Sequence, residues 1–285
     1  MNNIELAKKY LPYLDEVYKV SAKSSILDGD ENTVKKGDVG EIKVAKLDMD
    51  ALGDFSRNDG YTKGSTSFHW ETIKYDKERS QDLRIDRLDN QEALGIPFAK
   101  LSSEFVRVKV VPETDAARFA KIASAENISK EQDTLNTGAK TVEALRACTD
   151  KMDEDEVPTE NRILFITPTL IGEVEDLDTT KSKKVLERFS TIIPVPQSRF
   201  YTAVTLNDGK TKYGYSKTEG AGNINFLCVE KSAAVTAMDQ YIKYFTPDQD
   251  QDGDDNVFKY RNNNLYGHCY ENKRAGIYLS YDMTT

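Results

Sequence analysis

The sequence has few of the residues from which catalytic sites are usually built. Its 285 residues include two histidines, three cysteines and one tryptophan. Two histidines leave little for acid–base catalysis, and no serine or cysteine occurs in the setting of a nucleophile elbow or a catalytic triad. The cysteines are few, far apart and odd in number, which argues against a disulfide scaffold and fits a reducing cytoplasm. We therefore expect a protein that is not an enzyme.

Long apolar runs and an excess of positive charge are also missing. No run approaches the length of a membrane span, and the first residues, MNNIELAKKY, lack the apolar core of a signal peptide. We expect no membrane contact and synthesis in the cytoplasm. The chain has 39 Lys and Arg against 48 Asp and Glu, a net charge of −9. Such a chain is a poor ligand for the nucleic-acid backbone, which basic residues must neutralise.

The clearest regular pattern is a long amphipathic segment at 90–125. Leu83 and Ile85 alternate with charged residues just before it, which predicts a strand. Apolar residues then recur at helical spacing, so we predict a helix about 54 Å long at about 1.5 Å per residue. Pro112 removes one helical hydrogen bond and predicts a kink or break at about 108–111. The apolar positions of this helix are Phe98, Leu101, Phe105, Val108, Phe119 and Ile122.

Residues 40–80 have the pattern of a long hairpin. Ile42 and Val44 alternate with charged residues, and the return run TSFHWETIKYD places Phe68 and Trp70 on one face. The connecting segment SRNDGYTKGSTS is rich in turn-forming residues. Because an isolated two-stranded hairpin is only marginally stable in water, we expect this one to lie on another surface.

An amphipathic segment at 4–20 precedes the hairpin. Leu11, Leu14, Val17 and Tyr18 share one helical face. This face predicts a helix that packs either on the core of its own chain or on another molecule.

Strands and helices alternate over 126–245, which predicts a compact α/β lobe. The sequences RILFI and INFLCV predict buried strands. After the lobe, strands at 257–260 and 276–281 are expected on either side of an Asn-rich turn at 262–264. The predicted helices of the lobe include one with Val142, Leu145 and Cys148 on its inner face and one over 231–245 with Val235, Met238 and Ile242 inward.

Asp248, Asp250, Asp252 and Gly253 spell D-x-D-x-D-G, the first half of an EF-hand calcium loop. The twelfth position of such a loop is Lys259 instead of a bidentate glutamate, so these aspartates are weak candidates, and a solvated acidic loop is expected. We predict neither a metal nor a cofactor. The remaining possible ligands lack the paired spacing of a zinc site; they are His69, His268 and Cys269.

The run DLRIDRLDNQEALGIPFAKLSSEFVRVKVVPETDAARFAKIA resembles the spine segment of tailed-bacteriophage major capsid proteins, which have the Hong Kong 97-type capsid fold. INFLCVEKSAA, followed by FKYR and by ENK and GIY, resembles the C-terminal part of the same family. The resemblance covers most of the chain and implies an α+β fold. Its expected parts are an N-terminal arm (1–39), an extended β-hairpin loop (40–80), a peripheral domain with the long spine helix (81–125 and 246–285) and an axial domain (126–245).

The resemblance implies a structural protein that self-assembles into the icosahedral head shell of a tailed phage. Hexamers and pentamers are expected to enclose double-stranded DNA without sequence specificity, and the expected location is the virion capsid. A portal and a scaffolding protein are expected partners, the latter because no long N-terminal coiled-coil extension is present. The net charge suits a wall that must not bind packed DNA, although it also fits ordinary solubility. Candidate contacts between subunits are Leu11, Leu14, Tyr18, Phe68 and Trp70.

Several alternatives remain open at this level. Trp70 could belong to the core of its own chain instead of an interface. Some proteins of the resembled fold join subunits by a Lys–Asn isopeptide bond, for which Lys63 and 262–264 are candidates without a supporting motif. An encapsulin-like bacterial nanocompartment shell protein, with an enzyme as cargo, is the alternative function. A calcium-dependent binding module at 248–255 and a soluble enzyme are further readings.

Overall fold

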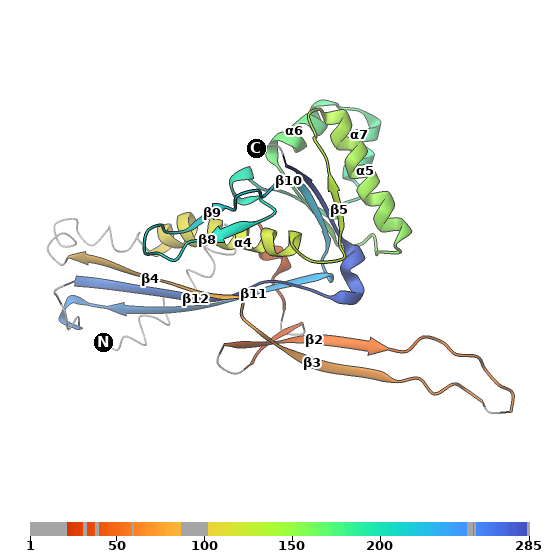
Figure 1. Ribbon diagram of the computed structural model, residues 1–285, viewed down its shortest axis with the longest axis horizontal. Helices are drawn as coiled ribbons and strands as arrows, with labels where there is room; N and C mark the ends of the chain where they lie inside the picture. Colours follow the sequence, from red (N-terminus) through yellow and green to blue (C-terminus); the bar gives the residue numbers. More distant parts are fainter. Residues whose placement is uncertain are drawn as a thin grey trace.

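The computed structural model describes residues 22–30, 33–37, 40–58, 60–86, 102–249, 253 and 255–283. These residues form a central three-stranded sheet with a helix on it, a five-stranded lobe and a projecting hairpin sheet (Figure 1). The predicted α+β class is confirmed. The predicted helix at 4–20 and the first part of the predicted spine helix, at 90–101, lie outside the described residues.

The central sheet pairs three antiparallel strands in the order β11-β12-β4. The helix α4 (Val111–Ala123) packs on it, preceded by helical residues 102–105 and a π-helical turn at Val106–Val110. Pro112 sits in the first turn of α4, where a missing N–H is tolerated. The predicted irregularity is therefore a π turn and not a break. The strands are β4 (Lys77–Asp86), β11 (Ala234–Phe245) and β12 (Asp255–Cys269).

The lobe is a five-stranded sheet in the order β5-β13-β10-β6-β7. Its three helices pack on one face, and the C-terminal half of α4 packs on the other, where the rings of Phe119 and Phe165 lie 5.1 Å apart. The helix α4 thus belongs to the cores of both sheets. The strands are β5 (Ser129–Gln132), β6 (Arg162–Ile166), β7 (Thr191–Pro194), β10 (Asn223–Glu230) and β13 (Ile277–Asp282), and the helices are α5 (Gly138–Glu154), α6 (Pro168–Asp176) and α7 (Thr180–Leu186).

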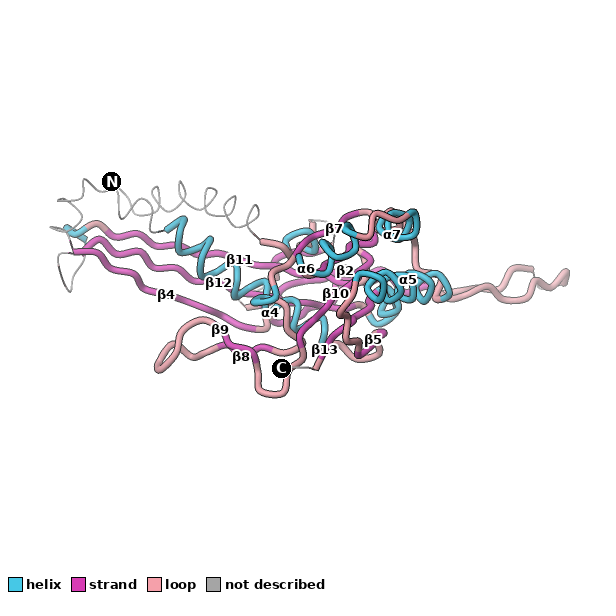
Figure 2. Tube along the Cα trace, turned by 90° about the horizontal axis from the view of Figure 1, so that it is seen from above, coloured by secondary structure: helices cyan, strands magenta, loops and turns pink. Residues whose placement is uncertain are grey.

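The hairpin sheet has the order β1-β2-β3 and carries the predicted hairpin. Its connection at 50–65 extends past the body, in the direction opposite to the free ends of the central strands (Figures 1 and 2). The hairpin ends earlier than predicted, because β4 already pairs with β12. The strands are β1 (Val34–Lys36), β2 (Glu41–Met49) and β3 (Thr66–Lys74).

Smaller elements connect these parts. A short hairpin of β8 and β9 lies beside α4 (Figure 1), and short 3₁₀-helices occur between the larger elements. They are β8 (Val204–Leu206), β9 (Tyr215–Lys217), η1 (Ser25–Leu27), η3 (Gln197–Arg199), η4 (Pro247–Gln249) and η5 (Glu271–Gly276).

The helix predicted at 231–245 is wrong, because this segment forms β11. Its alanines favour a helix by propensity, but its backbone pairs with β12 from Ala234 to Phe245. A bulge between Val235 and Ala237 shifts the alternation, so that Met238 packs against the core under the π-helical turn. The pairing with a distant strand therefore outweighs the local preference.

The turn predicted at the three asparagines is also wrong, because β12 runs through Asn262–Asn264 without interruption. All three asparagine side chains are buried, and those of Asn262 and Asn264 are hydrogen-bonded, whereas Oδ1 of Asn263 and Oδ1 of Asn264 have no partner among the described residues. Asn264 Nδ2 donates to Asn262 Oδ1 at 3.0 Å, and Asn262 Nδ2 donates to the hydroxyl of Tyr260 at 3.3 Å. These bonds let polar residues remain in a central strand.

The domain boundaries stay a prediction, but the sheets divide the chain differently. The strand β11, assigned to the axial domain, pairs with β12 in the central sheet, and β13, assigned to the peripheral domain, lies in the five-stranded lobe. A division by sheets therefore exchanges these two strands.

Candidate assembly surface

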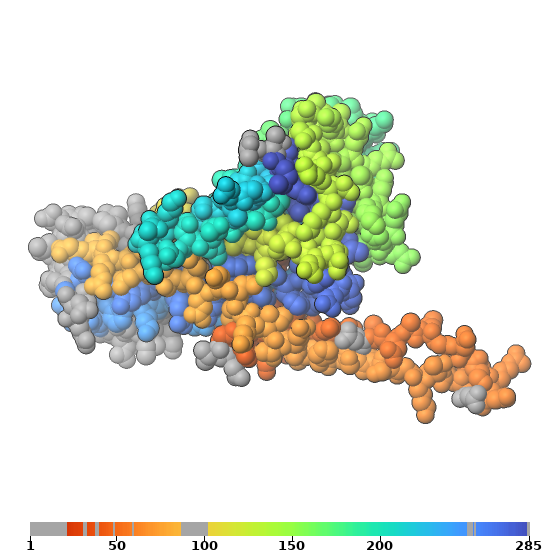
Figure 3. All heavy atoms as spheres, in the orientation of Figure 1, coloured from red at the N-terminus to blue at the C-terminus, as the bar shows by residue number. Residues whose placement is uncertain are grey.

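The distal hairpin carries most of the large apolar side chains that the described residues expose. Six of eleven such side chains lie between residues 47 and 68. Leu52 is fully exposed, and Tyr61 is 88% exposed. The space-filling view shows this part standing clear of the body (Figure 3). The six residues are Leu47, Met49, Leu52, Phe55, Tyr61 and Phe68, which we call the distal apolar surface.

Two predicted contact residues meet on this hairpin. The rings of Phe68 and Trp70 lie edge to face with centroids 5.8 Å apart. Trp70 is half-buried, and the Lys35 ammonium lies 4.3 Å from its ring centre. Trp70 is therefore shielded by its own chain only in part, and Phe68 remains 60% exposed. Leu11, Leu14 and Tyr18, the other predicted contacts, lie outside the described residues.

The root of the hairpin has a small apolar core of its own. Ile42 and Val44 of β2 are buried against Val235 of β11 and Leu265 of β12. The predicted alternation at Ile42 and Val44 thus reports the face that packs on the central sheet. This contact ends within β2, and the residues beyond it make up the exposed distal part.

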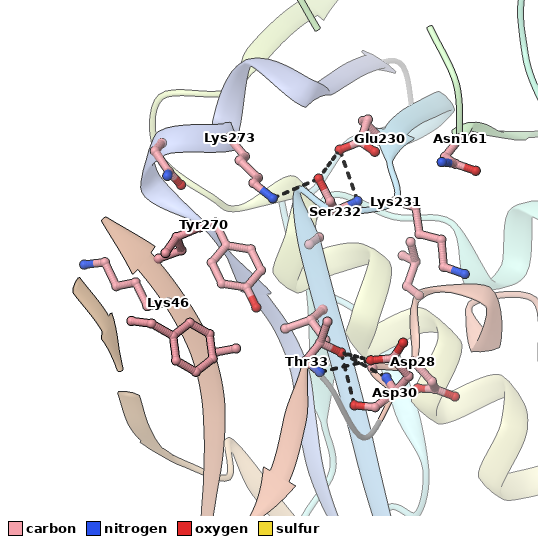
Figure 4. A pocket seen from close by; sticks show the side chains of 18 of the residues that line it. Asp28, Asp30, Thr33, Lys46, Asn161, Glu230, Lys231, Ser232, Tyr270 and Lys273 are labelled. Carbon is pink, nitrogen blue, oxygen red and sulfur yellow. Dashed lines mark hydrogen bonds between the residues drawn. The ribbon is translucent and has the colours of Figure 1, made fainter. Parts of the chain in front are cut away.

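A groove of about 510 Å³ lies where the hairpin leaves the body (Figure 4). Leu47, Met49 and Phe68 line it from the hairpin, and Tyr270 and Lys273 line it from the body. The distal apolar surface therefore continues into a hollow. Polar side chains close its far end, where the ammonium of Lys273 donates to the hydroxyl of Ser232 at 3.0 Å and Ser232 donates to Glu230.

A buried carboxylate fixes the segment that leads into the hairpin. Asp115 of α4 is fully buried, and its Oδ1 accepts bonds from the backbone N–H of Ser24 at 3.0 Å and from the Ser24 hydroxyl at 2.6 Å. Its Oδ2 accepts from the N–H of Lys23 at 3.0 Å and from Arg199 at 3.2 Å. These bonds therefore fix the segment at 23–24 at one point on the spine helix.

The guanidinium of Arg118 lies one turn further along α4 and is also fully buried. It pairs with Asp28 at 2.6 Å, and the hydroxyl of Thr236 donates to the same carboxylate. Sequence reasoning missed this role of Asp115 and Arg118. The available signal was two charged residues at a spacing of three within the apolar face of α4.

A second ion pair attaches the β8–β9 hairpin. Arg79 of β4 binds both oxygens of Glu113 on α4, at 2.7 and 3.2 Å, and donates to the carbonyl of Asn207 at 2.7 Å. The bond to Glu113 raises the pKa of the Arg79 guanidinium. One side chain thus joins the central sheet, the spine helix and the β8–β9 hairpin.

The candidates for metal binding and covalent chemistry gain little support. Asp248 lies in η4, whereas Asp250 and Asp252 are outside the described residues. Among described residues, no group of three or more His, Cys, Asp and Glu side chains is placed to hold a metal ion. Burial raises the pKa of the Cys269 thiol to about 11. The asparagines proposed for an isopeptide bond are at most 5% exposed, so Lys63 of another copy has no access to them in this conformation.

Within the described part of the chain, no helix is both long and apolar enough to span a membrane.

No protein-family model matches this sequence, and no characterised protein matches it in sequence. Solved structures do match its fold. A virus-like particle from Pyrococcus furiosus is 11% identical with a TM-score of 0.59, over 97% of this chain and 99% of that chain. The mature capsid of bacteriophage PhiM1 is 10% identical with a TM-score of 0.55, over 86% and 83%. The capsid of cyanophage P-SCSP1u is 14% identical with a TM-score of 0.53, over 89% and 86%.

These matches span 86–97% of this chain. The resemblance noted in the spine and C-terminal residues is thereby confirmed for the fold. The chain has the Hong Kong 97-type fold of tailed-phage major capsid proteins.

Proposed function

We propose that this protein is the major capsid protein of a tailed phage, whose copies assemble into an icosahedral shell around double-stranded DNA. The observation that carries the proposal is the distal apolar surface, which projects from a chain with a capsid fold. Large exposed apolar patches mark interaction surfaces. A closed symmetric assembly supplies the missing cover, because each copy offers the same surface to a neighbour.

Many modest contacts suffice for such a shell. Each hairpin buries only a few side chains, but every subunit contacts several others, so the contacts add up to a stable assembly. Hexamers and pentamers are the expected units. The net charge of −9 keeps a wall from binding packed DNA tightly, which agrees with a container that must release its contents.

The proposed partners are other copies of the chain, a portal and a separate scaffolding protein. The proposed location is the virion capsid, after synthesis in the host cytoplasm. These partners follow from the proposed role.

Electron microscopy of the purified protein tests the proposal. We expect closed shells of uniform diameter when the chain is expressed with its scaffolding protein. A compact single chain whose hairpin is folded back on its own body contradicts the shell. Correctly sized empty shells from the chain alone contradict the need for a separate scaffold but leave the shell intact.

An encapsulin-like compartment remains the second candidate, because the similarity to the virus-like particle from Pyrococcus furiosus is at least as extensive as that to the phage capsids. Particle contents separate the two. Packaged nucleic acid in particles from infected cells favours the phage head, and a co-purified enzyme inside the shell favours the compartment.

A further inference from the structure

The angle between the hairpin and the body is set by side chains. Within the described residues, no strand of the hairpin sheet pairs with a strand of the central sheet. Backbone hydrogen bonds join the chain to the central sheet on either side of the hairpin sheet: the N–H of Gly29, before β1, donates to the carbonyl of Thr236 at 2.9 Å, and the N–H of Asp76, after β3, donates to the carbonyl of Asn264 at 2.8 Å. Side-chain contacts at the root must therefore hold the hairpin in its direction.

A carboxylate on β11 makes two of these contacts. Oδ1 of Asp239 accepts from the ammonium of Lys36, at the end of β1, at 2.7 Å. Oδ2 of Asp239 accepts from the hydroxyl of Tyr75, just after β3, at 2.9 Å. The two oxygens therefore hold both edges of the hairpin root from one point on the body. The Asp239 side chain is 16% exposed and that of Lys36 is 76% exposed, so the bond from the half-buried Tyr75 is the better shielded from water.

Both donors stay protonated at neutral pH. Burial, together with the bond to Asp239, raises the pKa of Tyr75. The bond to Asp239 also raises the pKa of Lys36. The neighbouring Asp76 accepts from the ammonium of Lys121 on α4 at 2.9 Å and from the N–H of Tyr266 on β12 at 2.8 Å. Tyr75 and Asp76, at the exit of β3, are thus bonded to β11, to α4 and to β12.

The geometry gives small rotations at the root a large effect. The nine residues that follow Val44 reach about 30 Å if extended, at about 3.4 Å per residue, so a rotation of about 10° moves their end by about 5 Å. A displacement of that size separates the distal apolar surface from any fixed partner, because apolar contacts need atoms within about 4.5 Å.

We propose that Asp239 is a positioning residue that fixes the hairpin angle in the single chain, before copies meet, and so sets the geometry of assembly. The inference rests on the proposed shell for its consequence but not for its first test. A preset angle reduces the ordering that assembly requires, since the hairpin is already in its contact conformation.

The first test measures distances within one chain. Spin labels at Lys63→Cys and Glu143→Cys, in a chain with Cys269→Ser, report the hairpin relative to α5 by double electron–electron resonance. Labelled chain is diluted in an excess of unlabelled chain, so that only distances within one molecule are read. We expect one narrow distance distribution for the parent chain and a distribution shifted or broadened by several ångströms for Asp239→Ala.

Two further variants keep the test interpretable. Tyr75→Phe removes one bond to Asp239 while keeping the buried ring, and an intermediate broadening is expected even if Asp239→Ala folds poorly. Asp82→Ala is the matched control, because Asp82 is an exposed carboxylate on the same sheet, paired with Arg84 and Lys259. Its distribution should equal that of the parent. An unchanged narrow distribution in both Asp239→Ala and Tyr75→Phe overturns the inference.

The second test is the diameter of the assembled particles. For Asp239→Ala we expect a wider spread of diameters or open sheets, and for Asp82→Ala we expect particles of the parent size. If the parent forms no shell, the proposed function fails while the distance measurement still decides the role of Asp239. If Asp239→Ala forms uniform parent-sized shells, the bonds of Asp239 to Lys36 and Tyr75 do not set the geometry of assembly.

Discussion

At the scale of single residues, buried polar groups determine where the segments of this chain attach to one another. Asp115 accepts four bonds, from Ser24, Lys23 and Arg199, and Arg118 pairs with Asp28 in the same region. A buried charge of this kind is tolerated because each oxygen has donors. Removing one partner leaves the others buried without a bond, which makes these positions more sensitive than the exposed ion pairs.

Asp115→Asn tests this sensitivity. The amide places donors where the carboxylate accepted bonds, so we expect a loss of about 3–5 kcal/mol in the free energy of unfolding, measured by urea denaturation. Asp178→Asn is the control, because Asp178 is 77% exposed and pairs with Lys183 at the surface. Its change should stay within about 0.5 kcal/mol. Equal urea midpoints for the two variants contradict the assignment.

A second prediction at this scale concerns pH. Burial lowers the pKa of His268, so the folded chain keeps this imidazole neutral to lower pH than the unfolded chain does. The unfolded chain takes up the proton first, and the stabilising contribution, complete above pH about 6.5, is lost as the pH falls below that value. The charged groups near the ring are Glu71, Lys46, Glu271 and Arg274.

The measurement compares urea midpoints at pH about 7.5 and about 5.5, on either side of the ordinary histidine pKa, for the parent and His268→Gln. We expect the midpoint of the parent to fall more steeply than that of the variant, which has no imidazole to protonate. Parallel pH dependences contradict the prediction.

At the scale of elements, the hairpin has two halves with different physical roles. Its root packs Ile42 and Val44 into the body, whereas its distal half exposes apolar side chains that the described residues cover only in part. A change in the root therefore alters the stability of the single chain. A change in the distal half alters contacts between chains, because those side chains are already in water in the free molecule.

Phe68→Asp separates the two effects. Phe68 is 60% exposed but packs edge to face on Trp70, so the free energy of unfolding should fall by about 1 kcal/mol, which leaves the chain folded. Shell formation should be lost, because a charge is placed in an apolar contact. Phe68→Met, which keeps the contact apolar, is the control and should still give shells by electron microscopy. Normal shells from Phe68→Asp exclude this surface from the interface.

At the scale of the whole molecule, the described chain is an elongated body with extensions in two directions (Figures 1 and 2). The lobe and the central sheet share α4, which makes them one packed unit. The hairpin is the part with the least cover from its own chain, and Trp70, the only tryptophan, lies on it. Assembly should therefore be visible in the fluorescence of one residue.

We expect the emission of Trp70 to shift to shorter wavelength and to become less sensitive to iodide when shells form. The half-buried ring loses its remaining contact with water if a neighbour covers the hairpin. Trp70→Phe provides the blank, since no other tryptophan is present. Identical emission and quenching in single chains and in shells place Trp70 away from the interface.

The sequence by itself determined the elements whose burial follows a local period. The alternation at Ile42 and Val44, the spacing in α5, the apolar runs of β6 and β10 and the buried face of α4 appear as predicted. Val108, predicted on the same apolar face, is instead 46% exposed, and it lies in the π-helical turn, where the helical period changes. In each case the side chains that must leave water are near one another in sequence, so their spacing reports the buried face. The sequence also shows that the distal hairpin contains apolar residues. It does not show that the rest of the chain leaves them exposed.

Only the tertiary structure decided the form of β11 and β12 and the role of Asp239. An alanine-rich segment became a strand, and three asparagines stayed inside one, because strands far along the chain complete their backbone hydrogen bonds. Asp239 is an ordinary acidic residue in the sequence and acquires its function from Lys36 and Tyr75, which the fold brings to its two oxygens. Pairings over such separations leave no local period, so they are decided only when the whole chain is packed.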